Sequence, residues 1–172
     1  MTRILSLDDD SEMLKLLGLI LELAGYEHLR TTNSHEALSL LRGEPIDLFT
    51  QDCLRPDIDC LEFYQLMKSD VSLRTIPVLF ISAGSRPEIA AECRATYGDD
   101  YLVKPFSPPE LLATVAGLLR RHSKHVPTEA ERAARYEAVR AKLKSEMNWS
   151  GEWLDRFCER IDGWLKEMSK GS

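Results

Sequence analysis

The segment Ile46-Asp47-Leu48-Phe49-Thr50-Gln51-Asp52 contains a short, nearly continuous apolar run around Leu48 and Phe49 and ends in a carboxylate. Such a run is typical of a strand that helices cover on both faces of a parallel sheet. The segment Val78-Leu79-Phe80-Ile81-Ser82 has the same character and ends in a hydroxyl group. Because ligands of open parallel sheets bind at the carboxyl ends of the strands, these two ends indicate where functional groups gather.

Short apolar runs alternate with segments of helical periodicity from residue 2 to about residue 121, which is the pattern of repeated strand–helix units. We expect strands at Arg3–Leu7, His28–Thr32, Ile46–Gln51, Val78–Ser82 and Tyr101–Val103, with His28–Thr32 near an edge. We expect helices at Ser11–Ala24, Ser34–Leu41, Leu61–Ser69, Pro87–Thr96 and Pro108–Arg121. The predicted fold is α/β: a (βα)5, flavodoxin-like, doubly wound parallel sheet with strand order 2-1-3-4-5.

A helical hairpin is expected to follow this domain. Thr128 and Glu131 form a capping box that opens a helix ending near Met147. A second helix begins near Ser150 and carries a strong apolar stripe: Trp153, Leu154, Phe157, Ile161, Trp164, Leu165 and Met168. The first helix has a thinner stripe of Tyr136, Val139, Leu143 and Met147. We therefore predict an α/β domain at 1–122, a linker at 123–127 and a hairpin at 128–170. The sequence leaves open whether the strong stripe packs on the first helix, the α/β domain, a second subunit or another protein.

Length and composition narrow the class of protein. The chain has 172 residues, 44% of them apolar, which suits one compact domain with an appendage. No apolar run is long enough to span a bilayer, and the N-terminus leads directly into a strand, so we expect a cytoplasmic protein without membrane contact. Cys53, Cys60, Cys93 and Cys158 lack metal-cluster spacing, and we interpret them as free thiols.

Charge is distributed unevenly along the chain. Residues 1–119 contain 10 Lys and Arg against 19 Asp and Glu, whereas residues 120–172 contain 12 against 9. The acidic front part is a poor surface for nucleic-acid phosphates. In the tail, basic residues alternate with glutamates, and we interpret them as a solvated helix face: Arg132, Arg135, Arg140, Lys142 and Lys144. A DNA-binding tail remains the alternative, although the tail contains no evident helix-turn-helix.

Chemically useful side chains follow four of the predicted strands. They are Asp8, Asp9 and Asp10 after the first strand, Asp52 after the third, Ser82 after the fourth and Lys104 after the fifth. Singly, each has an ordinary explanation, such as stabilisation of a helix N-terminus by the aspartates. Together they crowd carboxylates into one crevice, where two of them about 4 Å apart repel by about 4 kcal/mol at an effective dielectric of 20. A cation such as Mg²⁺ relieves this repulsion, and the set suits phosphoryl transfer.

These residues resemble those of the receiver domain of bacterial response regulators, over roughly residues 2 to 121. The motifs that carry the resemblance are Asp8-Asp9, the segment Asp52-Cys53-Leu54-Arg55-Pro56-Asp57-Ile58-Asp59, Ser82-Ala83, and Tyr101-Leu102-Val103-Lys104-Pro105-Phe106. The resemblance implies a two-component signalling switch that is not an enzyme in the usual sense. Its expected partners are a sensor histidine kinase or phosphotransfer protein, and an unidentified protein or a second copy at the hairpin.

The resemblance also implies roles for individual residues. Asp52 is expected to be the phosphoacceptor and to attack a phosphohistidine. Mg²⁺ is expected to bind the side chains of Asp9 and Asp52, the backbone carbonyl of Leu54 and, through water, Asp8. Lys104 is expected to contact the phosphoryl group and to precede a cis peptide bond to Pro105. Ser82 and Tyr101 are expected to form a switch pair.

Three residues depart from the family pattern. Cys60 stands where glycine usually follows Asp59, which leaves the loop geometry open because that position often has a positive φ. Gln51 replaces an apolar residue, but strand alternation points its side chain away from Asp52. Thr114 replaces an arginine of regulators that dimerise through this face, so we do not expect that dimer. A receiver-like domain that works without phosphorylation remains a further alternative.

Overall fold

The computed structural model describes residues 1–84, 91, 99–147 and 151–170. Five parallel strands form one sheet in the order β2-β1-β3-β4-β5. Their bounds are β1 Arg3–Leu7, β2 Glu27–Thr31, β3 Leu48–Asp52, β4 Val78–Ser82 and β5 Asp100–Val103. The predicted fold class and strand order are therefore confirmed, and β2 is indeed an edge strand.

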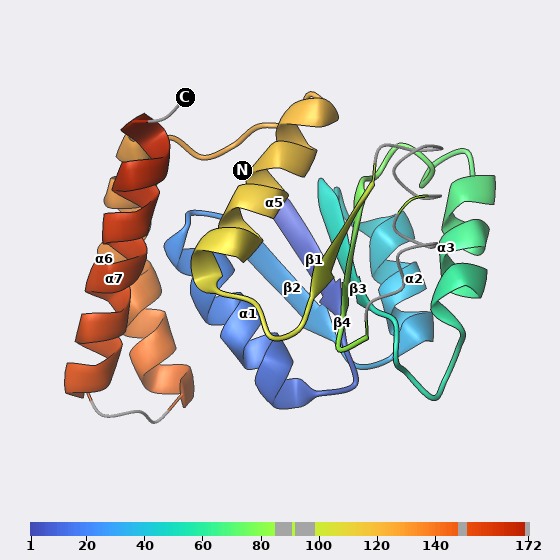
Figure 1. The fold of residues 1–172 in the computed structure, drawn as a ribbon, viewed down its shortest axis with the longest axis horizontal. Coiled ribbons are helices and arrows are strands. Elements are labelled where there is room, and N and C mark those ends of the chain that lie inside the picture. Colours follow the sequence, from blue (N-terminus) through green and yellow to red (C-terminus); the bar gives the residue numbers. More distant parts are fainter. Residues whose placement is uncertain (85–90, 92–98, 148–150, 171–172) are drawn as a thin grey trace.

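Helices cover both faces of the sheet (Figure 1). Their bounds are α1 Ser11–Leu23, α2 Ser34–Gly43, α3 Cys60–Ser69, α5 Pro108–Arg121, α6 Glu129–Met147 and α7 Gly151–Lys170. Residues of α1 and α5 share one buried apolar cluster, and residues of α2 and α3 belong to a second cluster on the other face. The helix predicted at Pro87–Thr96 falls almost entirely outside the described residues.

Most predicted boundaries agree with the observed ones within two residues. The start of β3 shows the reason for a difference of two residues. The strand was expected from Ile46, but its pairing with β1 begins at Leu48. Before that point the backbone N–H of Asp47 donates to the carbonyl of Arg3, while the N–H of Arg3 donates to the side-chain Oδ2 of Asp47, both at 2.9 Å. Gly25, directly after the helix-ending Ala24, has a φ of 88°, the left-handed conformation that glycine commonly adopts at the end of a helix.

The hairpin of α6 and α7 packs along one side of the α/β domain, next to α1 and α5 (Figure 1). Val139, Leu143, Cys158, Ile161 and Leu165 are buried in the same cluster as the apolar residues of α1 and α5. The tail thus packs both on itself and on the α/β domain, which decides between partners that the sequence left open. The predicted capping box is confirmed, because Glu131 accepts a hydrogen bond of 2.7 Å from the N–H of Thr128.

The basic residues of α6 hold this arrangement together. Lys142 pairs with Glu22 of α1 at 2.8 Å, and Arg140 pairs with Asp155 of α7. Arg135 donates a hydrogen bond of 3.0 Å to the carbonyl of Gly25. Lys142 and Lys144 are exposed, as a solvated face requires, but the other three, Arg132, Arg135 and Arg140, are half-buried. Several of their partners come from α1, α7 and the turn after α1, about which periodicity within α6 carries no information.

Two smaller expectations concern thiols and membranes. Cys53, Cys60 and Cys158 are buried thiols outside any disulfide, while Cys93 lies outside the described residues. Among the helices that the structure describes, none combines the length and apolar character needed to cross a bilayer.

Candidate functional site

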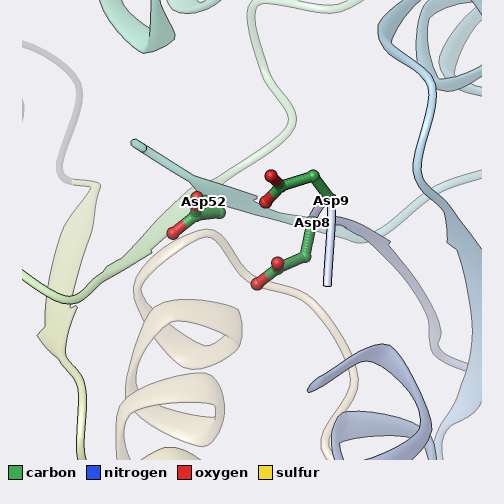
Figure 2. Close-up of side chains that lie close together, drawn as sticks. All are labelled: Asp8, Asp9 and Asp52. Atoms are coloured by element: carbon green, nitrogen blue, oxygen red, sulfur yellow. The ribbon is translucent and has the colours of Figure 1, made fainter. Parts of the chain in front are cut away.

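Three carboxylates meet at the carboxyl ends of β1 and β3, which are neighbours in the sheet. Figure 2 shows Asp8 and Asp9 directly after β1 and Asp52 at the end of β3. One oxygen atom from each of the three lies within 4.8 Å of the others. Asp8 and Asp52 are buried, whereas Asp9 is exposed and gives the cluster an open side. The group that the sequence placed at these strand ends is thus brought together.

Lys104, just after β5, closes the cluster from the opposite side. Its Nζ lies 2.8 Å from Oδ2 of Asp8 and 3.2 Å from Oδ1 of Asp52. Burial raises the pKa of Asp8, and the hydrogen bond from Lys104 opposes that rise only in part. Burial alone would lower the pKa of Lys104, but hydrogen bonds and charge attraction from Asp8 and Asp52 raise it above its usual value. Lys104 therefore remains a cation that offsets part of the negative charge.

Backbone N–H groups orient the two buried carboxylates. The N–H of Leu54 donates to Oδ2 of Asp52 at 2.9 Å, and the N–H of Asp10 donates to Oδ1 of Asp8 at the same distance. Asp10 itself points away from the cluster and caps α1. The ordinary explanation of helix capping thus applies to Asp10, while Asp8 and Asp9 belong to the site.

Ser82 and Tyr101 are linked through Gly84, a contact that the sequence did not predict. The buried Oγ of Ser82 accepts a long hydrogen bond of 3.5 Å from the N–H of Gly84. The hydroxyl of Tyr101 donates to the carbonyl of Gly84. The half-buried ring of Tyr101 also stacks on Phe80, with ring centroids 6.3 Å apart. In the sequence, only the closeness of Ser82 and Gly84 along the chain could have indicated their hydrogen bond, and nothing indicated the contact of Tyr101 with Gly84.

The loop after β3 leads to Cys60, which contacts Gln51, and both residues depart from the family pattern. Cys60 is the first residue of α3, and Asp59 caps that helix by accepting from the N–H groups of Leu61 and Glu62. Among the described residues other than glycine, only Ser123 has a positive φ, so the backbone at Cys60 does not need a glycine. Gln51 points away from Asp52 and donates to the carbonyl of Cys60 at 3.1 Å.

The cluster fits a hard divalent cation. Its donors are carboxylate oxygens from three residues, which is the ligand type that Mg²⁺ and Ca²⁺ prefer. The exposed side chain of Asp9 leaves room for water and for a further oxygen ligand. Leu54 has an exposed side chain, and its backbone lies beside Asp52. The expected cis peptide bond between Lys104 and Pro105 is present.

More than half of the chain is similar to one known protein family. The family model of the response regulator receiver domain matches residues 4–116. The phosphate regulon transcriptional regulatory protein PhoB of Pseudomonas aeruginosa is 31% identical over 118 residues, which are 69% of this chain and 52% of that protein. The uncharacterised transcriptional regulatory protein YrkP of Bacillus subtilis is 37% identical over 121 residues, which are 70% and 51% of the two chains. The chain thus spans about half the length of the curated relatives that it matches.

Solved structures show the same similarity. The chemotaxis protein CheY4 of Vibrio cholerae has a TM-score of 0.64 at 28% identity, and the match covers 69% of this chain and 99% of that one. A putative response regulator from Chloroflexus aurantiacus also has a TM-score of 0.64, at 31% identity, and covers 70% and 98% of the two chains.

Proposed function

Since the chain belongs to the response regulator receiver family, a family of signalling switches in two-component systems, we propose that Asp52 accepts a phosphoryl group from a phosphohistidine. The donor would be a sensor histidine kinase or a phosphotransfer protein, the partners with which receiver domains interact. The observation that carries the proposal is the gathering of Asp8, Asp9, Asp52 and Lys104 at adjoining strand ends.

In the proposed reaction, a carboxylate oxygen of Asp52 attacks the phosphorus atom, the P–N bond to the donor histidine breaks, and the histidine leaves with the electron pair. The N–H of Leu54 holds the other oxygen of Asp52 in place. Lys104 would move from its carboxylate partners to the phosphoryl oxygens and neutralise their charge. Asp9, Asp52 and the carbonyl of Leu54, with Asp8 through water, would hold Mg²⁺, which supplies further charge neutralisation when bound.

The switch is proposed to pass through Ser82, Gly84 and Tyr101. The Oγ of Ser82 would turn toward a phosphoryl oxygen and give up its long contact with Gly84. A shift of the backbone at Gly84 would remove the acceptor of the Tyr101 hydroxyl, and the ring could then move farther inward beside Phe80. Tyr101 and Lys104 belong to the strand and loop that lead into α5, so the change would reach that helix.

The output is proposed to be a protein–protein interaction that the helical tail controls. Residues 1–122 would act as the receiver, 123–127 as a linker and 128–170 as the interaction element. Support comes from the contact of α7 with α5 and from Phe106, which follows the Lys104–Pro105 bond and packs against the cluster that contains Ile161 and Leu165. Movement at Lys104 therefore has a short path to the hairpin.

Two alternatives remain testable. Several relatives are named transcriptional regulatory proteins, which favours a DNA-binding tail as the second candidate. Such a tail should bind DNA with an affinity that falls steeply as salt rises. A receiver-like domain that works without phosphate is the third candidate, and it would bind its partner equally well with Asp52 replaced by Asn.

The direct test uses Mg²⁺ and acetyl phosphate, with intact mass and tryptophan emission as readouts. All three tryptophans lie in the tail, at positions 149, 153 and 164. A gain of one phosphoryl group that Asp52→Asn abolishes, together with an emission change, supports a switch coupled to the hairpin. A gain without an emission change makes the tail an independent module, and no gain despite bound Mg²⁺ favours the receiver-like alternative.

A further inference from the structure

Two cavities, each of about 330 Å³, lie where the hairpin meets the α/β domain. Glu129 and Arg132 of α6 line both of them. The first cavity has further walls from Tyr26 at the start of β2, Leu112 of α5 and Leu165 of α7. Cavities of this size, with mixed polar and apolar walls, are typical of sites for small molecules.

Arg132 is fixed in the wall between the cavities. Its Nη1 donates a hydrogen bond of 2.8 Å to the carbonyl of Pro127. Its stem passes so close to Gly25 that a Cβ added there would lie 2.9 Å from Cγ of Arg132. The glycine after α1 therefore leaves the space in which this arginine is held.

The opposite edge of the same guanidinium group, formed by Nε and Nη2, has no hydrogen-bond acceptor in the described part of the chain. Both of these nitrogen atoms are buried. In a planar guanidinium these two N–H groups lie side by side and point the same way, which matches the two oxygens of a carboxylate. Buried donors without partners are costly, so this edge calls for an acceptor.

Charge and shape define that acceptor further. Arg120 also lines the first cavity, so two arginines face one glutamate there. Leu112, Ala116 and Leu165 give the same cavity an apolar side. We propose that the junction binds a small organic carboxylate whose oxygens accept from Nε and Nη2 of Arg132 and whose apolar part lies along these three side chains.

Glu129 is the natural competitor for the same edge. It is exposed, lines both cavities and stands three residues before Arg132 on α6. Since Nε and Nη2 have almost no contact with solvent, side chains in the cavity wall must shift for a ligand to reach them. Bound ligand would connect walls from the α/β domain and the hairpin, and would stabilise their docked arrangement by mass action. This site is separate from Asp52, and the proposal does not rest on phosphorylation of Asp52.

The test compares 3-phenylpropionate with the neutral 3-phenylpropan-1-ol, by calorimetric titration of the full chain. The acid should bind saturably at one site, and the alcohol should bind at least about tenfold more weakly. Arg132→Met should weaken binding of the acid by at least about tenfold, whereas Glu129→Gln should strengthen it. Arg156→Met, on the exposed side of α7, and Asp52→Asn should leave it unchanged. Hydrogen exchange in α6 and α7 should slow when the acid binds.

Three outcomes would overturn the proposal. Equal affinity for acid and alcohol in the unmodified chain would mean that only an apolar cavity is present. Unchanged binding in Arg132→Met would remove the guanidinium from the site. Failure of the acid to bind either the unmodified chain or Glu129→Gln would show that this edge takes no organic carboxylate. Since the comparison of acid and alcohol needs no variant, it decides the case even if Arg132→Met folds poorly.

Discussion

Replacement of Lys68 by Met is expected to destabilise the protein by about 3–5 kcal/mol. Nζ of Lys68 in α3 lies 3.0 Å from Oδ2 of Asp99, and the two side chains are 2% and 0% exposed. In Lys68→Met, Asp99 keeps its hydrogen bonds from the hydroxyl of Tyr64 and the N–H of Val78, both at 2.7 Å, but loses its positive neighbour. The large cost follows because a buried carboxylate without a cation cannot regain its hydration.

Lys166→Met is the matched control. Lys166 pairs with Asp162 on α7 at 2.7 Å, which is closer than the Lys68–Asp99 pair, yet these side chains are 53% and 45% exposed. Water screens such a pair, so its loss should cost less than about 1 kcal/mol. If distance alone governed the energy, Lys166→Met would be the more harmful change.

Urea unfolding followed by circular dichroism measures both variants. The double variant Lys68→Met/Asp99→Asn should be more stable than Lys68→Met alone, because it removes the uncompensated charge. If Lys68→Met costs no more stability than Lys166→Met, burial does not set the energy of the ion pair. The same follows if the stability losses of Lys68→Met and Asp99→Asn simply add in the double variant. The pair connects α3 to the residue before β5, the strand that carries Tyr101, so its loss should also reduce phosphorylation of Asp52.

Three further predictions concern acid stability, the turn after α1 and the site itself. Burial lowers the pKa of His28 to about 3 in the folded protein, against an ordinary value near 6.5. The contribution of neutral His28 to stability is therefore fully present above pH 6.5 and is lost as the pH falls from 6.5 toward 3. His28→Gln, which can keep a hydrogen bond to Ser6, should reduce the loss of unfolding free energy between pH 7 and pH 5 by up to about 1.4 kcal/mol per pH unit. The same pH dependence in the variant and the unmodified protein, measured by urea unfolding, would contradict this. Gly25→Ala should lower the free energy of unfolding by more than about 1 kcal/mol, because φ is +88° and the new Cβ would lie 2.9 Å from Cγ of Arg132. Gly43→Ala should not lower Tm, because no atom lies within 4 Å of the Cβ that it adds. Lys104→Met should raise Mg²⁺ affinity by about threefold or more in calorimetric titration while reducing phosphorylation, and a lower Mg²⁺ affinity would contradict the charge balance of the site.

The sheet could be predicted because its strands carry their own signal. The apolar runs of β3 and β4 indicate burial on both faces, and the chemically active residues stand at their ends. The meeting of Asp8 with Asp52 then follows from parallel strands in neighbouring positions. The strand order itself needed the analogy with other sheets of five strands, since local patterns do not state which strand lies beside which.

The rest depended on contacts between distant parts of the chain. An apolar stripe on α7 shows that the helix has a buried face but does not name the partner, so its docking on α1 and α5 became visible only in the structure. The basic residues of α6 were interpreted as a solvated face, which concealed the ion pair of Lys142 with Glu22. No local pattern indicated the buried pair of Lys68 with Asp99. The contact from Tyr101 to Gly84 joins backbone to side chain, and periodicity cannot show such a link.

The central claim is that Asp52 receives the phosphoryl group. The most direct measurement treats the protein with Mg²⁺ and acetyl phosphate, reduces the resulting acyl phosphate with borohydride, and maps the changed residue by peptide mass spectrometry. We expect the aspartate at position 52 to be converted to homoserine, in a reaction that depends on Mg²⁺ and is strongly reduced in Lys104→Met. Modification at Asp8, at Asp9 or at no aspartate would contradict it.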